Sequence, residues 1–141
     1  MIAVDTGCFV ALADKGDRWH GRAVACLSTQ SEGWVTTWPV LAEACHVLSR
    51  RLDPRYAAWL MEDVAEGSLA VWSPAAAQFT RIPTLLRQYA SLPMDLADAS
   101  LVLLAEHLGH GRILSTDERD FGAYRWKRTK PFNNLLAESP S

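Results

Sequence analysis

The sequence predicts one α/β domain, in which a mostly parallel sheet of about four to five strands is flanked by helices. Short apolar or β-branched runs alternate with longer stretches of helical periodicity along most of the chain. The length of 141 residues matches a single domain, and 49% hydrophobic with 21% charged residues is a globular composition. We therefore expect residues 1–141 to form one domain, with a flexible tail over about the last eight residues.

Four short runs are predicted to be the strands of this sheet. They are rich in aliphatic, aromatic and β-branched residues, and glycine or turn residues precede several of them. These runs are Met1–Val4, Trp34–Thr37, Leu69–Trp72 and Arg112–Thr116. In open α/β sheets the functional crevice lies beyond the carboxyl ends of the strands. Asp5 and Asp117 directly follow the first and fourth runs, so two carboxylates are expected at that edge.

Six stretches have the apolar spacing or the end signals of helices. They are residues 6–15, 22–28, 39–51, 54–64, 75–90 and 96–108. Pro39 and Pro54 suit first turns, whereas Pro83 should kink or split the fifth helix. The last stretch is the clearest amphipathic helix, and Gly109 ends it. Beyond it and the fourth strand the chain is short, basic and aromatic, and we expect one edge strand there.

The distribution of apolar residues and the cysteine content argue against membrane and disulfide-rich proteins. The chain has no long apolar segment and no basic leader at Met1, so we expect a cytoplasmic protein that does not enter membranes. The three cysteines, an odd number without a CxxC pair, are expected to be buried free thiols. They are Cys8, Cys26 and Cys45.

The net charge of −2 argues against a nucleic-acid ligand, but the distribution of charge does not. Six of the 14 basic residues fall within the 19 positions from 112 to 130. They are Arg112, Arg119, Arg125, Lys127, Arg128 and Lys130. Such a segment either binds a polyanion such as RNA or is simply a solvated surface, and composition alone leaves both interpretations open.

Two carboxylates in the first third of the chain are candidate catalytic or metal-binding groups. Asp5 ends a predicted strand and precedes Thr6, so its oxygens can face the crevice, although Asp5 or Thr6 would also serve as a helix cap. Glu43 lies one turn into a helix that is otherwise apolar around it. We expect it at the margin of the buried face, where a carboxylate must be paired, protonated or bound to metal. An ordinary exposed glutamate is the alternative.

Two further acidic groups occur in the last third. Asp95 and Asp98 are three residues apart, on one face of a helix start whose dipole favours the ionised form. We assign Asp98 to metal binding and Asp95 to capping or to support of the ligands. Asp117 follows a strand that contains Ser115, while Asp120 falls in what reads as the next turn, where a structural role is the alternative.

Carboxylates from separate elements would converge if the first, second and fourth strands were neighbours in a parallel sheet. Such a cluster repels itself and raises the pKa of its members, so a fold retains it mainly to hold a cation. Ligands that are all oxygen favour Mg²⁺ or Mn²⁺ over zinc. We therefore expect a site for a divalent cation where these carboxylates meet.

The sequence resembles the PIN domains and, among them, the VapC-type toxins of bacterial toxin–antitoxin pairs. The resemblance spans nearly the whole chain and rests on the order and spacing of four stretches. These are Val-Asp-Thr at Asp5, Leu-Ala-Glu at Glu43, Asp-Leu-Ala-Asp-Ala around Asp98 and Thr-Asp-Glu-Arg-Asp-Phe around Asp117. Ser115 departs mildly from the family, which usually has threonine at that place.

The resemblance implies a PIN-like fold and a metal-dependent endoribonuclease that leaves 5′-phosphate and 3′-hydroxyl ends. It implies a catalytic and metal-binding quartet with Thr6 nearby, formed by Asp5, Glu43, Asp98 and Asp117. Asp95, Ser115 and Asp120 form a second group of candidates. It also implies an RNA substrate, a small antitoxin whose tail enters the acidic crevice, and a homodimer.

Two non-catalytic roles are the alternatives, an RNA-binding PIN-like module and a Mg²⁺-dependent phosphoacceptor domain. The first is disfavoured because all four acidic positions are filled. The second needs an aspartate at the end of a mid-chain strand, and neither run 34–37 nor run 69–72 has one. A histidine-based site is also disfavoured, because Gly109 ends the helix between His107 and His110.

Overall fold

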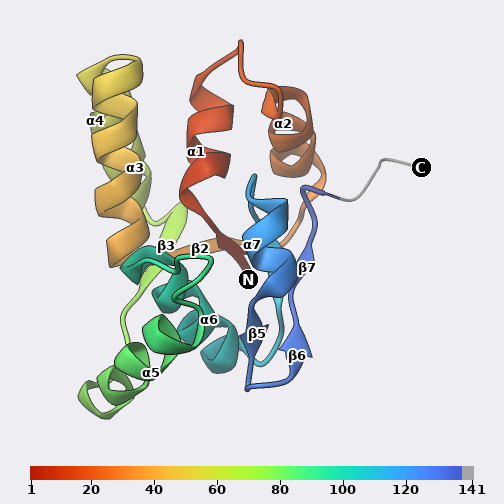
Figure 1. The fold of residues 1–141 in the computed structure, drawn as a ribbon. Coiled ribbons are helices and arrows are strands. Elements are labelled where there is room, and N and C mark those ends of the chain that lie inside the picture. Colours follow the sequence, from red (N-terminus) through yellow and green to blue (C-terminus); the bar gives the residue numbers. More distant parts are fainter. Residues whose placement is uncertain (138–141) are drawn as a thin grey trace.

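The main sheet of the protein contains five parallel strands in the order β3-β2-β1-β4-β7. It is seen in a computed structural model that describes residues 1–137 (Figure 1). The strands are β1 (Ile2–Val4), β2 (Trp34–Thr37), β3 (Leu69–Trp72), β4 (Arg112–Leu114) and β7 (Asn133–Asn134). The predicted α/β class, the parallel sheet and the four predicted strands are confirmed, and β1 lies between β2 and β4, as convergence of the carboxylates requires.

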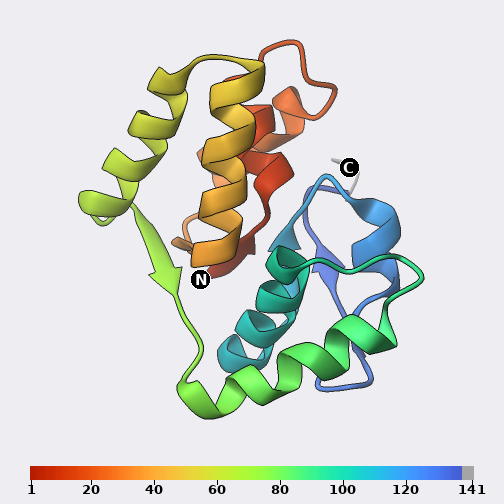
Figure 2. The same cartoon turned by 60° about the vertical axis from the view of Figure 1, so that its left-hand side comes forward.

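Helices cover both faces of this sheet. The helices are α1 (Thr6–Ala13), α2 (His20–Thr29), α3 (Trp38–Arg51), α4 (Pro54–Ala65), α5 (Arg81–Gln88), α6 (Leu96–Leu108) and α7 (Glu118–Ala123). Helices α1 to α4 lie on one side and α5 and α6 on the other (Figures 1 and 2). Connections between parallel strands are right-handed. The connections from β1 to β2 and from β2 to β3 run in one direction across the sheet, whereas the connection from β3 to β4 runs back in the other direction. Their helices therefore lie on opposite faces.

This topology determines where a functional crevice can form. From β1 the chain moves toward β2, whereas from β4 it moves outward to β7. The topological switch point is therefore between β1 and β4, and the crevice of an open parallel sheet lies at the carboxyl ends of the strands beside such a point. Asp5 follows β1 and the segment 115–117 follows β4, so both reach this crevice.

The buried core is built from the two central strands and from α6. Ile2 and Val4 of β1, and Ile113 and Leu114 of β4, are fully buried. In α6 the whole segment Leu101–Ala105 is at most 1% exposed, so this helix is buried on more than the single face expected of an amphipathic helix. It contacts β1 and β2 of the sheet together with α3, α5 and β5, which fixes its first turn at the crevice.

Two elements differ from the prediction. Strand β4 ends at Leu114, two residues before the predicted end at Thr116. The side-chain amide of Asn134 forms hydrogen bonds with the N–H and the carbonyl of Ser115, so these backbone groups do not pair with a neighbouring strand. A turn was expected after Asp117, and that prediction is wrong: Glu118 and Asp120 lie in the first turn of α7. This helix has six residues, too few for apolar periodicity to reveal, and buried Phe121 anchors it.

The helix predicted over 75–90 is split, as Pro83 suggested. A 3₁₀ helix, η1 (Ala76–Thr80), precedes α5, and Pro83 lies in the first turn of α5, where its missing N–H costs no hydrogen bond. After α7 a small hairpin forms from β5 (Arg125–Trp126) and β6 (Lys130–Pro131), and the single edge strand expected is β7.

The carboxyl-terminal residues and the cysteines complete the comparison. Residues 134–137 of the predicted tail contact the domain, through pairing of β7 with β4 and through the buried side chain of Leu136. The rest of that prediction, residues 138–141, lies outside the described part. No disulfide forms within residues 1–137, and the expected burial of the cysteines holds for Cys8, whereas Cys26 and Cys45 are half-buried. Within residues 1–137 no helix is both long and apolar enough to span a bilayer.

Gly7 allows α1 to pack against the loop after β4. A Cβ at this position would overlap the hydroxyl of Thr116 and lie 3.0 Å from the Thr116 Cβ. We predict that Gly7→Ala lowers the free energy of unfolding by about 1–3 kcal/mol, measured by urea denaturation. Thr116→Gly removes the obstructing atoms, so Gly7→Ala should cost much less in that background.

Gly21→Ala is the matched control, because a Cβ on this helical glycine meets no atom within 4 Å. It should leave stability unchanged or raise it slightly. Equal losses from Gly7→Ala and Gly21→Ala would show that the close approach of α1 to Thr116 is unimportant.

Candidate active site

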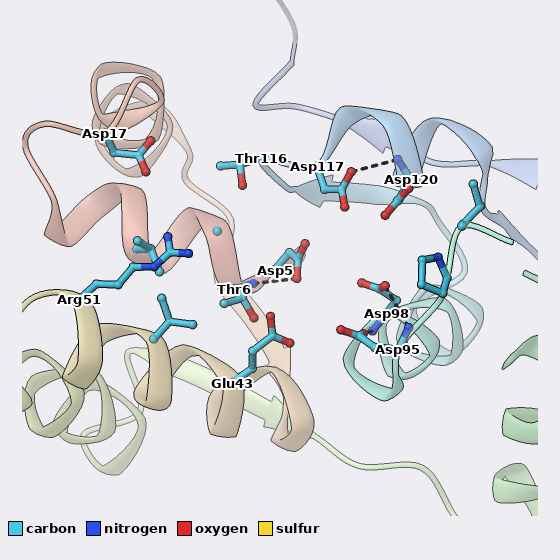
Figure 3. A pocket seen from close by; sticks show the side chains of 15 residues that line it. Asp5, Thr6, Asp17, Glu43, Arg51, Asp95, Asp98, Thr116, Asp117 and Asp120 are labelled. Carbon is cyan, nitrogen blue, oxygen red and sulfur yellow. Dashed lines mark hydrogen bonds between the residues drawn. The ribbon is translucent and has the colours of Figure 1, made fainter. Parts of the chain in front are cut away.

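A cavity of about 400 Å³ lies at the carboxyl ends of β1 and β4 (Figure 3). We call it the acidic pocket, because seven of the residues that line it carry carboxylates. They are Asp5, Asp17, Glu43, Asp95, Asp98, Asp117 and Asp120. The pocket thus brings together the four predicted quartet residues and Thr6. Of the second group of candidates, Asp95 and Asp120 also line it, whereas Ser115 lies behind Asp5 and donates a hydrogen bond to it.

Asp5 is at the base of the acidic pocket and is 8% exposed. It is the N-cap of α1: its Oδ1 accepts a hydrogen bond from the Thr6 N–H at 2.7 Å, and its Oδ2 accepts one from Ser115 Oγ at 3.0 Å. Burial raises the pKa of Asp5 to about 6, with additional repulsion from Glu43 and Asp117. Asp5 is therefore both a helix cap and a pocket carboxylate, and the two interpretations of the sequence are compatible.

Ser115 is held between two strands and orients Asp5. Its hydroxyl donates to Asp5 and accepts from the Asp117 N–H at 3.0 Å. The Asn134 amide clamps its backbone: Nδ2 donates to the Ser115 carbonyl at 2.8 Å, and Oδ1 accepts from the Ser115 N–H at 3.1 Å. Asn134 belongs to β7 and was not among the sequence-based candidates, yet it positions the hydroxyl that contacts Asp5.

Asp95 and Asp98 form the reciprocal cap expected at the start of α6. Asp95 Oδ1 accepts from the Asp98 N–H at 2.8 Å, and Asp98 Oδ2 accepts from the Asp95 N–H at 3.3 Å. The buried Tyr124 hydroxyl also donates to Asp98 Oδ2 at 3.0 Å. Burial raises the pKa of Asp98 to about 7, and the charges of Asp95 and Asp5 add to the effect.

Glu43 faces the acidic pocket from α3 (Figure 3). Its neighbours Val40 and Ala44 are fully buried while Glu43 itself is exposed to the cavity, which places it at the predicted margin of the buried face. Partial burial raises its pKa, the charge of Asp95 raises it further, and the hydroxyl of Thr6 lowers it. Its carboxylate is thus coupled to both sides of the pocket.

Asp117 and Asp120 enter the acidic pocket from α7. Asp117 is the N-cap, and its Oδ1 accepts from the Asp120 N–H at 3.0 Å. Burial raises the pKa of Asp117, as does the neighbouring Asp120 carboxylate. Asp120 itself accepts from Arg119 Nε at 3.2 Å. Asp120 therefore has a helical rather than a turn environment, and its side chain still lines the pocket.

Two charged residues of the pocket were not predicted. Asp17 comes from the loop between α1 and α2, and its Oδ1 accepts from the Trp19 N–H at 2.8 Å. Arg51 comes from the last turn of α3. Spacing could have found it: Glu43, Val47 and Arg51 are four residues apart and so lie on one helix face.

The six clustered basic residues do not gather around this pocket. Arg112 is at the start of β4, the opposite end from the pocket, and pairs with Glu32. The Arg125 guanidinium donates to three carbonyl oxygens at the end of α7. Lys127, Arg128 and Lys130 belong to the β5–β6 hairpin, beside the carboxyl end of α6 (Figure 1). None of the six lines the pocket, although Arg119 lies at its rim through hydrogen bonds to the lining residues Leu92 and Asp120. RNA contact by the set stays a prediction.

The fold agrees with the family that the sequence resembles. A family model described as the PIN domain matches residues 2–127. The chain belongs to the PIN-domain family. A curated relative, Ribonuclease VapC26 of Mycobacterium tuberculosis, is 24% identical over 124 residues, which cover 88% of this chain and 92% of that protein.

A solved crystal structure has the same fold. The crystal structure of Mycobacterium tuberculosis VapC20, described as a sarcin-ricin loop cleaving toxin, superposes with a TM-score of 0.77. The match is 22% identical and covers 84% of this chain and 92% of VapC20. At this level of identity the likeness establishes the fold of the chain.

The side chains of the PIN-domain pocket fit a hard divalent cation by their chemistry. Every potential ligand among the lining residues is a carboxylate or hydroxyl oxygen, the set that Mg²⁺ and Mn²⁺ prefer. Within residues 1–137 no three Asp, Glu, His or Cys side chains converge closely enough to enclose an ion unaided. Mg²⁺ suits such an open arrangement, because it usually keeps several waters and takes only one or two carboxylates.

We predict that the metal-free protein loses stability as pH rises. The pKa of Asp5 is about 6 in the folded state, against 3.8 for an ordinary aspartate, so the folded chain retains a proton that the unfolded chain releases. The free energy of unfolding should therefore fall between about pH 4 and about pH 6, by on the order of 3 kcal/mol from Asp5. Asp98, with a pKa of about 7, extends the window upward.

Urea denaturation of the wild type and of Asp98→Asn, in EDTA across this pH range, measures the effect. The variant should be the more stable at about pH 7.5 and should show a shallower pH dependence, because its amide does not ionise. Adding Mg²⁺ should stabilise the wild type most above the pKa of Asp98. Parallel pH profiles for the two proteins would contradict the coupling.

Proposed function

We propose that this PIN-domain protein is an endoribonuclease, the toxin of a toxin–antitoxin pair, and that it hydrolyses RNA with Mg²⁺ or Mn²⁺ held in the acidic pocket. The observation that carries the proposal is the convergence of Asp5, Glu43, Asp98 and Asp117 on one cavity at the switch point of the sheet. Four carboxylates from four elements, with raised pKa values, are costly to a fold unless a cation joins them.

Each carboxylate has a separate role in this proposal. Asp5, Asp98 and Asp117 would hold the ion, with Glu43 as a further ligand or as the group that orients and deprotonates the attacking water. When bound, a divalent cation supplies positive charge for the phosphate oxygens and acidifies water. Ser115 and Tyr124 hold Asp5 and Asp98 in place through their hydroxyls, and Thr6 tempers the basicity of Glu43.

The relatives support RNA as the substrate class. VapC26 carries the name ribonuclease, and VapC20 is described as cleaving the sarcin-ricin loop. Both matches extend over more than four-fifths of this chain. The acidic pocket supplies the chemistry that such an activity needs, and it opposes a purely RNA-binding module, because a carboxylate-lined cavity repels phosphate unless a cation is bound.

The enzyme should cleave single-stranded RNA in Mg²⁺ or Mn²⁺ and lose this activity in EDTA, as followed by gel electrophoresis of labelled RNA. We expect Asp5→Asn and Asp98→Asn to lower the rate by about 100-fold or more, because each removes a charge required to bind the ion. Asparagine can keep the hydrogen bonds that both side chains make, so the fold should be retained.

Asp63→Asn is the control, because this exposed aspartate of α4 does not line the acidic pocket. It should cleave at the wild-type rate. Cleavage that continues unchanged in EDTA, or that is absent with every divalent ion, would exclude the metal-dependent nuclease.

Regulation by a small antitoxin follows from the same proposal. A pocket with seven carboxylates is complementary to a basic peptide, and the antitoxin tail would occupy it and displace substrate. We also propose that the protein is a homodimer and acts in the cytoplasm.

Expression of the chain alone in a bacterial host should arrest growth, and co-expression of the small protein from a neighbouring reading frame should restore it. Asp98→Asn should be harmless, because arrest depends on cleavage. Colony counts after induction measure both effects. Normal growth during expression of active wild-type enzyme would contradict the toxin role while leaving the nuclease intact.

A further inference from the structure

Arg51 is the only lysine or arginine among the described residues that line the acidic pocket. It lies in the last turn of α3, two turns beyond Glu43. Figure 3 shows its guanidinium directed into the cavity on the side of Asp17, while Asp98 and Asp120 lie on the other side. The pocket therefore has a cationic end and an acidic end.

The Arg51 guanidinium has no partner among the described residues, although seven carboxylates share its cavity. No carboxylate oxygen of residues 1–137 comes within 4.0 Å of it, and no hydrogen bond joins it to the rest of that region. Arg119 at the rim differs, because it donates to Asp120 at 3.2 Å and to the Leu92 carbonyl at 3.1 Å. All five N–H donors of Arg51 thus remain available to a ligand.

The charge of the cavity indicates which ligand this arginine binds. Seven carboxylates and one guanidinium give the lining a formal charge of −6. A divalent cation would serve the phosphate at the acidic end, but the next phosphate of an RNA chain would still face net negative charge. A fixed cation at the other end offsets that repulsion, and an arginine fork matches a phosphate through two parallel hydrogen bonds.

We infer that Arg51 binds an RNA phosphate adjacent to the one that is cleaved, and so positions the substrate across the pocket. The inference rests on the proposed nuclease function. Arg51 is a positioning residue rather than a catalytic one, because its guanidinium lies more than 4.0 Å from every described carboxylate, at the end of the pocket away from Asp98.

The test compares Arg51→Ala, Arg51→Lys and Arg50→Ala with the wild type on a single-stranded RNA oligonucleotide. Arg51→Ala should raise KM by about 10- to 100-fold with little change in kcat, as expected for loss of one charge-assisted contact. For Arg51→Ala, the slope of the logarithm of the binding constant against the logarithm of the salt concentration should be shallower by about 0.7, the value for one lost phosphate contact to a single strand. Arg51→Lys should be intermediate, because it keeps the charge but loses the fork.

Arg50→Ala is the matched control. Arg50 is also in the last turn of α3 and exposed, but it does not line the pocket. Both substitutions remove one positive charge that favours the carboxyl end of the helix, so any shared effect on folding cancels. Thermal melts of the two variants should coincide, and Arg50→Ala should keep the wild-type KM.

A second arm identifies the phosphate. A single uncharged methylphosphonate linkage is moved along the oligonucleotide, one position at a time. The wild type should lose affinity at one linkage beside the cleavage site, and Arg51→Ala should lose nothing further there, because the two changes remove the same contact.

The outcomes separate this inference from the nuclease proposal. If the wild type cleaves RNA and Arg51→Ala matches Arg50→Ala in KM, salt slope and linkage scan, Arg51 does not position substrate. If the wild type cleaves no RNA, the nuclease proposal fails. In that case the inference about Arg51 is decided by the affinity of each protein for the same oligonucleotide in Mg²⁺, measured by fluorescence anisotropy. Equal affinities for the wild type and Arg51→Ala would overturn the inference. A weaker affinity for Arg51→Ala alone would support it.

Discussion

Mutual repulsion among carboxylates in one cavity is the constraint on which the rest of this structure depends. Three of the acids in the pocket are helix N-caps: Asp5 for α1, Asp95 for α6 and Asp117 for α7. Each accepts a backbone N–H, and these hydrogen bonds lower the pKa of Asp5 and Asp117 against the effect of burial. Capping and the proposed metal binding are therefore compatible in one arrangement, because the free N–H groups at a helix start stabilise the ionised acid.

The order of the strands makes this arrangement possible. Because β1 lies between β2 and β4, the connections after β1 and after β4 run in opposite directions from the switch point between these two strands. Helices α1, α3 and α6 all contribute residues to the acidic pocket at this point. Buried side chains behind the pocket then fix the carboxylates, through Ser115 for Asp5 and Tyr124 for Asp98. The pocket is thus rigid at its base, while its rim is formed by loops and by the exposed ends of helices.

Basic residues are distributed in a way that net charge and local clustering do not reveal. Most of the positive segment 112–130 is used within the fold, in an ion pair with Glu32, in capping the end of α7, and in packing against Trp126. The cation that faces the pocket comes instead from α3. The net charge that a ligand meets in the cavity is therefore set by seven carboxylates and one guanidinium, rather than by the basic segment.

The sequence alone determined the α/β class, four strands, six helices and the four acidic positions of the quartet. These depend on local signals: β-branched runs, helical periodicity, glycine and proline at the ends, acids after the first and fourth strands, and acids in the first turns of two helices. Tertiary structure decided the rest. Asn134 supports Ser115 across 19 residues, and Tyr124 contacts Asp98 across 26. No local pattern encodes these contacts, because they exist only once separate elements pack together.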